Sequence, residues 1–421
     1  MKARWFLGLG IAIGATVAVV RLLVSPPERA AAGAGDEAPP VIGTRLFEGV
    51  FDHVRTFAVD SLDAEELYRR AAAGVIEELD DPYAVLVMPG QPVGSLDSAG
   101  PQGVFLDRRN GLAVVVATVP GSPAAVAGVL AGDQLLAVDS IPIDVSHLAR
   151  GARLLAGEPG TTTTLRIRRP GHRGILSLDV TRGPGPEVVP VVATLLPGQI
   201  GLIELQSFVP DAPDSIRAAV ERLRRQGARA LVLDLRGTVG GALRQGAAVA
   251  DLFLGPRNTL AVSRGRPGAP SDTLADSSVS PFDSIPMAVL VDGGTAGAGE
   301  VVAGALQDHD RAAVLGDTTF GRGVTQSTYK LSEGVSLRLT TALWITPSGR
   351  QIQRPPNPPA DSAPAPRMKS DAGRPLPGGG GIVPDRVVSD SGPNDPVLAA
   401  ARRLLLRAGS ARAVLGLVSE P

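Results

Sequence analysis

The order of apolar and polar positions predicts a helical region followed by a β-rich region. Between Thr44 and Leu86 apolar residues recur every three or four positions, which is typical of amphipathic helices. The second of these helices begins near Asp63 and ends at Asp81-Pro82, since proline disfavours helix at the residue before it. Short β-rich runs then alternate with Gly, Pro and Asp turns. They are Val104–Leu106, Leu112–Val119, Gln134–Val138, Thr161–Arg168 and Ile175–Val180, with one helix at about Ser146–Ala156.

From residue 199 onward strands alternate with helices, which predicts an α/β layer fold. Ile200–Leu205 is a strand, and Ala230–Leu235 and Met287–Val291 are continuous apolar runs of the kind found in buried parallel strands. Asp214 is placed to cap a helix that ends at Gly227. A Gly-rich turn after residue 291 leads into a helix from about Glu300 to Gln307.

The N-terminus predicts export of the rest of the chain. Lys2 and Arg4 precede an apolar run, Trp5–Val20, which Leu22–Val24 extends. A run of about 16 to 20 residues lies between a signal peptide and a minimal membrane-spanning helix. An uncleaved anchor and a cleaved signal peptide both remain open, with a buried core helix as the third alternative. We expect the body of the chain in the cell envelope, anchored and facing the periplasm or outside, or secreted.

Composition excludes several kinds of chemistry. The chain has no cysteine, and its four histidines show no metal-ligand spacing, so we expect no disulfide, no metal site and no cofactor. The net charge of −1 predicts no nucleic-acid partner. Of the basic residues only Lys2, Lys330 and Lys369 are lysines, which limits the candidates for a lysine general base.

An ordered set of motifs resembles the C-terminal processing (tail-specific) serine peptidases, family S41. The set runs from about residue 44 to 390 and comprises Leu79-Asp-Asp-Pro-Tyr83, Gly121–Gly128, Ala131–Asp139, Ala230–Gly241, Gly304–Asp308 with Arg311-Ala312, Thr319–Gln326, Leu339–Ala342, Thr346–Arg350 and Gly381–Asp385. The two segments between residues 121 and 139 look like the family's PDZ domain. The resemblance implies a crotonase/ClpP-like α/β peptidase core with an inserted β-rich PDZ domain and an N-terminal helical segment.

These patterns divide the chain into successive parts. The predicted division is 1–24 signal anchor or signal peptide, 25–43 linker, 44–92 N-terminal helical segment, 93–183 PDZ domain, 193–390 peptidase-like domain and 391–421 C-terminal helix. Within the peptidase-like domain, residues 354–381 are rich in Pro and Gly and predict a flexible loop.

The resemblance implies a serine nucleophile, a lysine general base and a glutamine that orients the lysine. Here the nucleophile position falls on Gly297 and the base position on Arg322, at the family's spacing of 25 residues, and Gln326 matches the glutamine. Glycine forms no acyl-enzyme, and arginine stays protonated, so neither residue performs the family's step. The predicted oxyanion donors are the backbone N–H groups of Gly240 and Ala298. The alternative is that the glycines in these turns serve only to close tight turns.

Two functions therefore remain open at the sequence level. One is an inactive relative that binds peptides or protein C-termini, or that presents proteins to an active peptidase. Its predicted peptide-binding residues are Gly103, Val104 and Phe105, because PDZ domains hold a peptide carboxylate at the loop before an open strand edge. The other is an active serine endopeptidase with a non-standard nucleophile, for which Thr295 and Ser327 are the nearby hydroxyls and His309 a relocated base.

Overall fold

The computed structural model describes two compact units. The described residues are 41–418 apart from 80, 82, 90–100, 110, 144–147, 149–153, 185–188, 269–270, 277–279, 281, 356–365 and 390–393. One unit comprises the residues up to Arg70 together with 267–269, and the other comprises the rest. The predicted anchor or signal peptide lies outside the described residues and stays a prediction. No helix in the described part of the chain is both long and apolar enough to span a membrane.

Two amphipathic helices follow the predicted pattern, but the second ends early. They are α2 (Val41–Phe57) and α3 (Ala64–Glu77), and the rings of Phe51 and Tyr68 pack with centroids 4.3 Å apart. The predicted end at Asp81-Pro82 is wrong. The Asp81 carboxylate instead accepts hydrogen bonds from the Thr340 N–H and hydroxyl, at 2.9 and 3.0 Å, which holds this segment against a strand.

The β-rich region forms an antiparallel sheet with the order β2-β3-β4-β6-β7, and β5 pairs with β4. Its strands are β2 (Val104–Arg109), β3 (Leu112–Thr118), β4 (Gln134–Val138), β5 (Ile141–Pro142), β6 (Thr162–Arg168) and β7 (Leu176–Thr181), and the short helix α4 spans Pro123–Val126. Among the described strands, β2 pairs only with β3, so it is an edge strand. Most of the helix predicted at Ser146–Ala156 lies outside the described residues.

A six-stranded sheet with the order β21-β16-β14-β10-β9-β8 forms the centre of the α/β region. Its strands are β8 (Val191–Leu196), β9 (Ile200–Leu205), β10 (Ala230–Asp234), β14 (Met287–Val291), β16 (Ala313–Gly316) and β21 (Arg386–Val387), all parallel except β8. Each central strand is apolar on both faces, as buried parallel strands are. The predicted strands at 200–205 and 287–291 have these bounds, and the strand predicted to reach Leu235 ends at Asp234.

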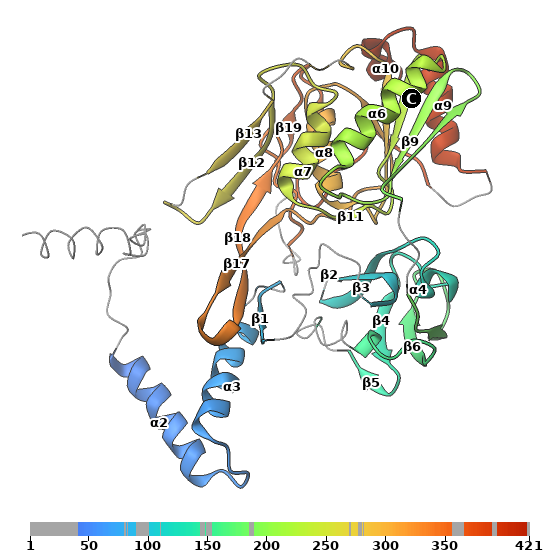
Figure 1. The fold of residues 1–421 in the computed structure, drawn as a ribbon. Helices are drawn as coiled ribbons and strands as arrows, with labels where there is room; N and C mark the ends of the chain where they lie inside the picture. Colours follow the sequence, from blue (N-terminus) through green and yellow to red (C-terminus); the bar gives the residue numbers. More distant parts are fainter. Residues whose placement is uncertain are drawn as a thin grey trace, which may run out of the picture. The chain divides into compact units, whose positions relative to one another are not determined.

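Alternate residues of these strands enter two separate cores. In β14, Val289 packs with α6 (Ala212–Arg225), α7 (Leu243–Asp251) and α8 (Ala298–Asp308), whereas Leu290 packs with α9 (Pro396–Arg407) and α10 (Ala411–Val418). The two helical layers therefore cover opposite faces of the sheet (Figure 1). Asp211, rather than the predicted Asp214, occupies the cap position of α6, and Asp214 lies in the first turn.

A second, antiparallel sheet and two small strand pairs complete the α/β region. The sheet has the order β1-β18-β12-β13, with β17 also paired to β18. Its strands are β1 (Val85–Val87), β12 (Thr259–Gly265), β13 (Asp272–Ala275), β17 (Val324–Lys330) and β18 (Ser336–Ile345). The small pairs are β11 (Val239–Gly240) with β15 (Ala296–Gly297) and β19 (Met368–Lys369) with β20 (Pro375–Leu376).

The Pro- and Gly-rich segment is more ordered than its composition predicts. Residues 368–376 form a hairpin through β19 and β20, and Leu376 is buried. The prediction of a flexible loop over 354–381 is therefore wrong for this part. Polar contacts made by Ser370 and Arg374 fix the hairpin, and composition does not reveal such contacts.

Candidate active site

Gly297 lies at the turn between β14 and α8, in a backbone conformation that glycine tolerates best. Its φ and ψ are 75° and −124°. A strand, a strained turn and a helix are the arrangement that presents a nucleophile in several hydrolases. Gly297 also pairs with Gly240 between the short parallel strands β15 and β11. A Cβ atom at residue 297 would lie 2.9 Å from the Gly240 carbonyl oxygen, so a side chain is disfavoured there twice, by φ and by crowding.

Arg322 is buried in an ion pair at the base position. Its Nε lies 3.0 Å from an Asp107 carboxylate oxygen, and both side chains are almost completely buried. Its guanidinium also lies over the Tyr83 ring, 5.4 Å from the centroid. Burial raises the pKa of the Asp107 carboxyl, while the Arg322 charge opposes that rise. Burial likewise raises the pKa of Tyr83. The site therefore holds a fixed cation where a general base would need a neutral amine.

Gln326 holds the backbone of Tyr83 through its side-chain amide. The amide nitrogen donates to the Tyr83 carbonyl oxygen at 2.9 Å, so Gln326 belongs to the same cluster as Arg322. A cavity of about 140 Å³ adjoins the cluster, and its lining comprises Gly241, Ala242, Leu243, Gly297, Ala298, Arg322, Val324, Thr325, Gln326 and Trp344. The structure thus places all three catalytic positions beside one cavity.

The two predicted oxyanion donors lie on either side of Gly297. Ala298 is the first residue of α8 and lines the cavity. Gly240 is paired with Gly297, and the next residue, Gly241, lines the cavity. Gly240 and Gly241 both have positive φ, 85° and 81°. Backbone N–H groups near a helix N-terminus suit an anionic oxygen. Whether these donors serve as an oxyanion hole stays a prediction.

Glu300 connects the two catalytic segments, a role that sequence reasoning missed. It is completely buried, and its carboxylate accepts hydrogen bonds from the Gly297 N–H at 3.1 Å, the Gly321 and Arg322 N–H groups at 2.8 Å, and the Thr319 hydroxyl at 2.5 Å. Burial raises its pKa, and these hydrogen bonds oppose the rise. The sequence did contain one indication of this role: Glu300 lies three residues after the N-cap, and an acid at that position often accepts a hydrogen bond from the cap N–H.

The nearby hydroxyls and His309 all have structural partners. Thr295 is buried, its hydroxyl lies 2.9 Å from the Leu235 carbonyl oxygen, and it accepts the Asp292 N–H at 3.0 Å. The Ser327 hydroxyl lies 2.8 Å from that of Thr341. His309 ends α8, with one ring nitrogen 2.8 Å from Asp371 and the other 2.7 Å from the Thr259 carbonyl oxygen. These contacts give all three side chains a structural role, and they place His309 at the opposite end of α8 from Gly297.

The predicted peptide-binding residues surround the start of β2. Gly103 has a φ of 76°, and a Cβ atom there would lie 2.3 Å from the Ser122 Cβ, so only glycine fits. Val104 is buried in the PDZ core, whereas Phe105 packs against a cluster that includes Phe320. The Gly103 loop therefore lies at an edge strand, as strand addition requires.

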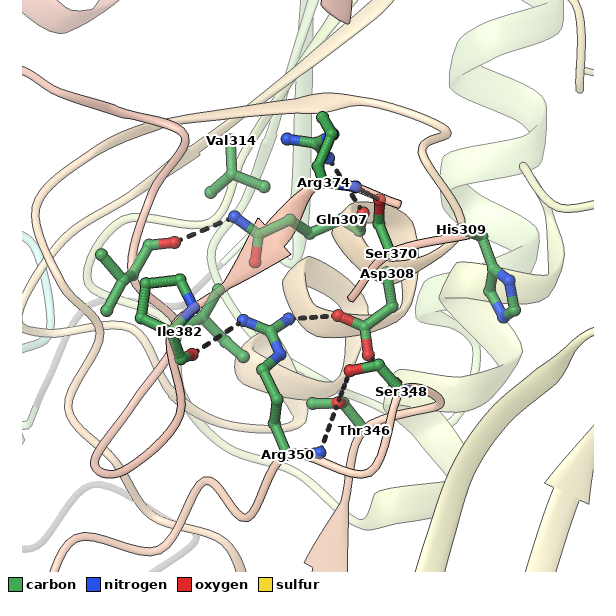
Figure 2. Close-up of polar contacts among 12 residues, drawn as sticks. Gln307, Asp308, His309, Val314, Thr346, Ser348, Arg350, Ser370, Arg374 and Ile382 are labelled. Carbon is green, nitrogen blue, oxygen red and sulfur yellow. Dashed lines mark hydrogen bonds and ion pairs between the residues drawn. The ribbon is translucent and has the colours of Figure 1, made fainter. Parts of the chain in front are cut away.

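The C-terminal end of α8 carries a buried polar network instead of a reactive site. Asp308 and Arg350 form an ion pair in which both side chains are 1% exposed. The Gln307 amide donates to the Val383 carbonyl oxygen at 2.9 Å, and an Arg374 guanidinium nitrogen donates to the Gln307 carbonyl oxygen at 3.2 Å (Figure 2). Arg374 also pairs with Asp385. Three motifs that are far apart in the sequence, Gly304–Asp308, Thr346–Arg350 and Gly381–Asp385, thus converge on one helix end. Their function is structural.

Comparison with known proteins agrees with this architecture. The profile of Peptidase family S41 matches residues 199–359, and that of a PDZ domain matches residues 114–169. A carboxy-terminal-processing protease of Bartonella bacilliformis is 34% identical, over 73% of this chain and 72% of that protein. A carboxyl-terminal-processing protease of Synechocystis is 33% identical, over 69% of each.

A solved structure and a more distant relative extend the likeness. The structure of a photosystem II D1 C-terminal processing protease matches 89% of this chain and 93% of its own, with a TM-score of 0.67 and 26% identity. The carboxy-terminal processing protease CtpA of Bacillus subtilis is 28% identical, over 72% of this chain and 65% of that protein. The likeness thus includes both the PDZ domain and the α/β core.

Proposed function

Because the chain belongs to peptidase family S41 and carries a PDZ domain, we propose that it binds peptide or protein C-termini without cleaving them. The observation that carries this proposal is the pair of residues at the catalytic positions, Gly297 and Arg322. The relatives named above are called proteases, so the proposal concerns a difference between this chain and its family.

The chemistry of the site supports a lack of hydrolysis. A glycine at residue 297 supplies no atom that attacks a peptide carbonyl. Arg322 stays protonated and is already paired with Asp107, so it accepts no proton from a hydroxyl. Loss of the nucleophile or its base in a serine protease lowers turnover by about 10⁶-fold. On this proposal, the protein keeps the family's architecture and does not hydrolyse peptides.

Peptide binding is supported by the edge strand and its loop. A peptide that adds to β2 forms main-chain hydrogen bonds, which do not depend on particular side chains. The Gly103 loop precedes this strand, where a carboxylate is held in PDZ domains. Ordering a short peptide has an entropy cost, so we expect a Kd of about micromolar.

Two experiments test the proposal. The full chain is incubated with unstructured peptides and with a fluorophosphonate probe, beside the Bartonella relative as a positive control. We expect neither hydrolysis nor labelling. Calorimetry then compares a peptide with a free C-terminus and its amidated form, and we expect the amidated peptide to bind at least tenfold more weakly. Equal binding of the two peptides would contradict a binding site for the peptide carboxylate. Labelling of the chain by the fluorophosphonate would contradict the proposal that it is inactive.

An active endopeptidase with a non-standard nucleophile is the alternative that the relatives' names favour. Thr295 is the hydroxyl closest in sequence to residue 297. If hydrolysis is found, Thr295→Ala identifies the source. Turnover lost in this variant would support the alternative, whereas unchanged turnover would point to a contaminating protease. A third role, in which the chain presents bound proteins to an active peptidase, is tested by adding the Bartonella relative to the complex and measuring cleavage.

A further inference from the structure

One face of strand β2 contacts the peptidase-like core. The strand alternates, so Val104 and Leu106 enter the PDZ core, whereas Phe105, Asp107 and Arg109 face the other way. Phe105 packs in a cluster with Val116, Ala117, Val239, Ala296 and Phe320. The Arg109 guanidinium lies 5.9 Å from the centre of the Phe320 ring. All of these residues belong to the larger compact unit.

Asp107 is the charged member of this face. Its side chain is completely buried and accepts hydrogen bonds from the Arg108 N–H at 2.6 Å and from the Tyr83 hydroxyl at 3.4 Å, besides its ion pair with Arg322. The backbone of Arg322 is fixed as well, because its main-chain N–H donates to the Glu300 carboxylate at 2.8 Å. A buried carboxylate without a cation is costly, and so is a buried guanidinium without an anion. Each of the two side chains thus needs the other for as long as both stay buried.

We propose that Asp107 is the positioning residue for Arg322, and that their buried ion pair is a latch that fixes the PDZ domain on the peptidase-like core at the base position. The latch joins two segments that come from different domains. Its existence does not depend on whether the chain hydrolyses peptides or only binds them. The partner of this surface is another part of the same chain. The Asp107 carboxylate, on edge strand β2, faces the Arg322 guanidinium.

A latch of this kind predicts a specific pattern of coupling. Asp107→Asn leaves the Arg322 guanidinium buried without the Asp107 carboxylate, and Arg322→Gln leaves the Asp107 carboxylate buried without the Arg322 guanidinium. Each single change therefore weakens the contact between the domains. The double change removes both charges at once, so it weakens the contact less than the two single changes together. Such non-additivity is the signature of a direct interaction.

Hydrogen exchange by mass spectrometry on the full chain measures this pattern. The informative peptides cover residues 104–118 on the PDZ side and 292–297 on the core side. In each single variant we expect both peptides to exchange about tenfold faster or more, since close charge pairs show strong coupling. In the double variant we expect exchange within about threefold of the wild-type rate.

The matched control is Asp133→Asn. Asp133 is also completely buried, and its cation, Arg169 at 2.8 Å, lies in the same domain. We expect this variant to accelerate exchange in the PDZ strands and to leave residues 292–297 unchanged. The proposal is overturned if Asp107→Asn behaves like Asp133→Asn or like the wild type, or if the single effects add in the double variant. If a single variant does not fold, recovery of folding in the double variant supports the latch, and a double variant that also fails overturns it.

Discussion

The two ends of helix α8 differ in what their buried charges do. At the C-terminal end, Asp308 and Arg350 are paired within one domain and join three segments of the α/β region. At the N-terminal end, Arg322 is paired with Asp107 of the PDZ domain, beside Gly297 at the predicted nucleophile position. Both ends are well packed. One buried pair therefore holds a single domain together, and the other joins two domains.

Glu300 explains why the N-terminal end stays assembled. Its carboxylate accepts donors from the turn at Gly297 and from the loop at Arg322, so it joins both segments without help from a serine or a lysine. Backbone donors do not change when side chains are substituted. The connection between the two segments therefore does not depend on the side chains at residues 297 and 322.

The largest expected effect is a gain of reactivity at the N-terminal end. Gly297→Ser with Arg322→Lys supplies a hydroxyl and an amine, but Asp107 holds that amine protonated, because a nearby carboxylate raises the pKa of a lysine. Adding Asp107→Asn should lower this pKa and increase fluorophosphonate labelling tenfold or more. Labelling rates of the double and triple variants across pH 6 to 10 measure the change. Equal rates would show that Asp107 does not control the amine.

The next effect is a loss of stability at the C-terminal end. Arg350→Met leaves the Asp308 carboxylate buried without its cation, which should lower the free energy of unfolding by about 3–5 kcal/mol. Urea unfolding followed by circular dichroism gives the value. The control is Arg244→Met, because Arg244 and Asp272 form an exposed pair and should contribute about 1 kcal/mol or less. A loss no larger than that of the control would remove the contrast between buried and exposed pairs.

A smaller effect concerns the backbone of the turn. Gly297→Ala should lower the free energy of unfolding by about 1–3 kcal/mol, because φ is 75° and a Cβ atom meets the Gly240 carbonyl. Gly237→Ala separates the two causes, since Gly237 also has a positive φ, 66°, but open space around its Cβ position. Thermal unfolding of both variants gives, as their difference, the contribution of crowding together with that of the Gly297 backbone conformation, whose ψ is −124°. If the two losses are equal, crowding by Gly240 contributes nothing.

The smallest effect is a pH dependence outside both ends of α8. Burial and the neighbouring Asp276 raise the pKa of Asp251 from 3.8 to about 6. A raised pKa in the folded state means that the stabilising contribution is present below about pH 4 and is lost as pH rises through about 6. Asp251→Asn should remove this dependence of the unfolding free energy on pH. We expect a change of about 1 kcal/mol or less, because the group is partly exposed. Melting temperatures of both proteins from pH 4 to 8 test it, and parallel curves would contradict the assignment.

The sequence alone determined much of the fold, because periodicity reports which faces are buried. Continuous apolar runs placed β10 and β14, and short β-rich runs between turns placed the strands of the PDZ domain. The motifs also predicted catalytic positions at Gly297, Arg322 and Gln326, and these three residues line one cavity in the structure. Local signals failed where a distant partner decides the outcome, as at the early end of α3 and in the hairpin at residues 368–376.

Only the tertiary structure decided which partners Gly297 and Arg322 have. The place of Glu300 three residues after the helix cap indicates its bond to the cap N–H, but nothing in the sequence pattern indicates that Glu300 also binds the loop at Arg322, or that Asp107 neutralises Arg322. Their partners lie in segments that only folding brings together. Burial then makes those pairings strong, since a charge removed from water requires a partner. Sequence thus determined which residues occupy the predicted catalytic positions, and packing decided which partners they have.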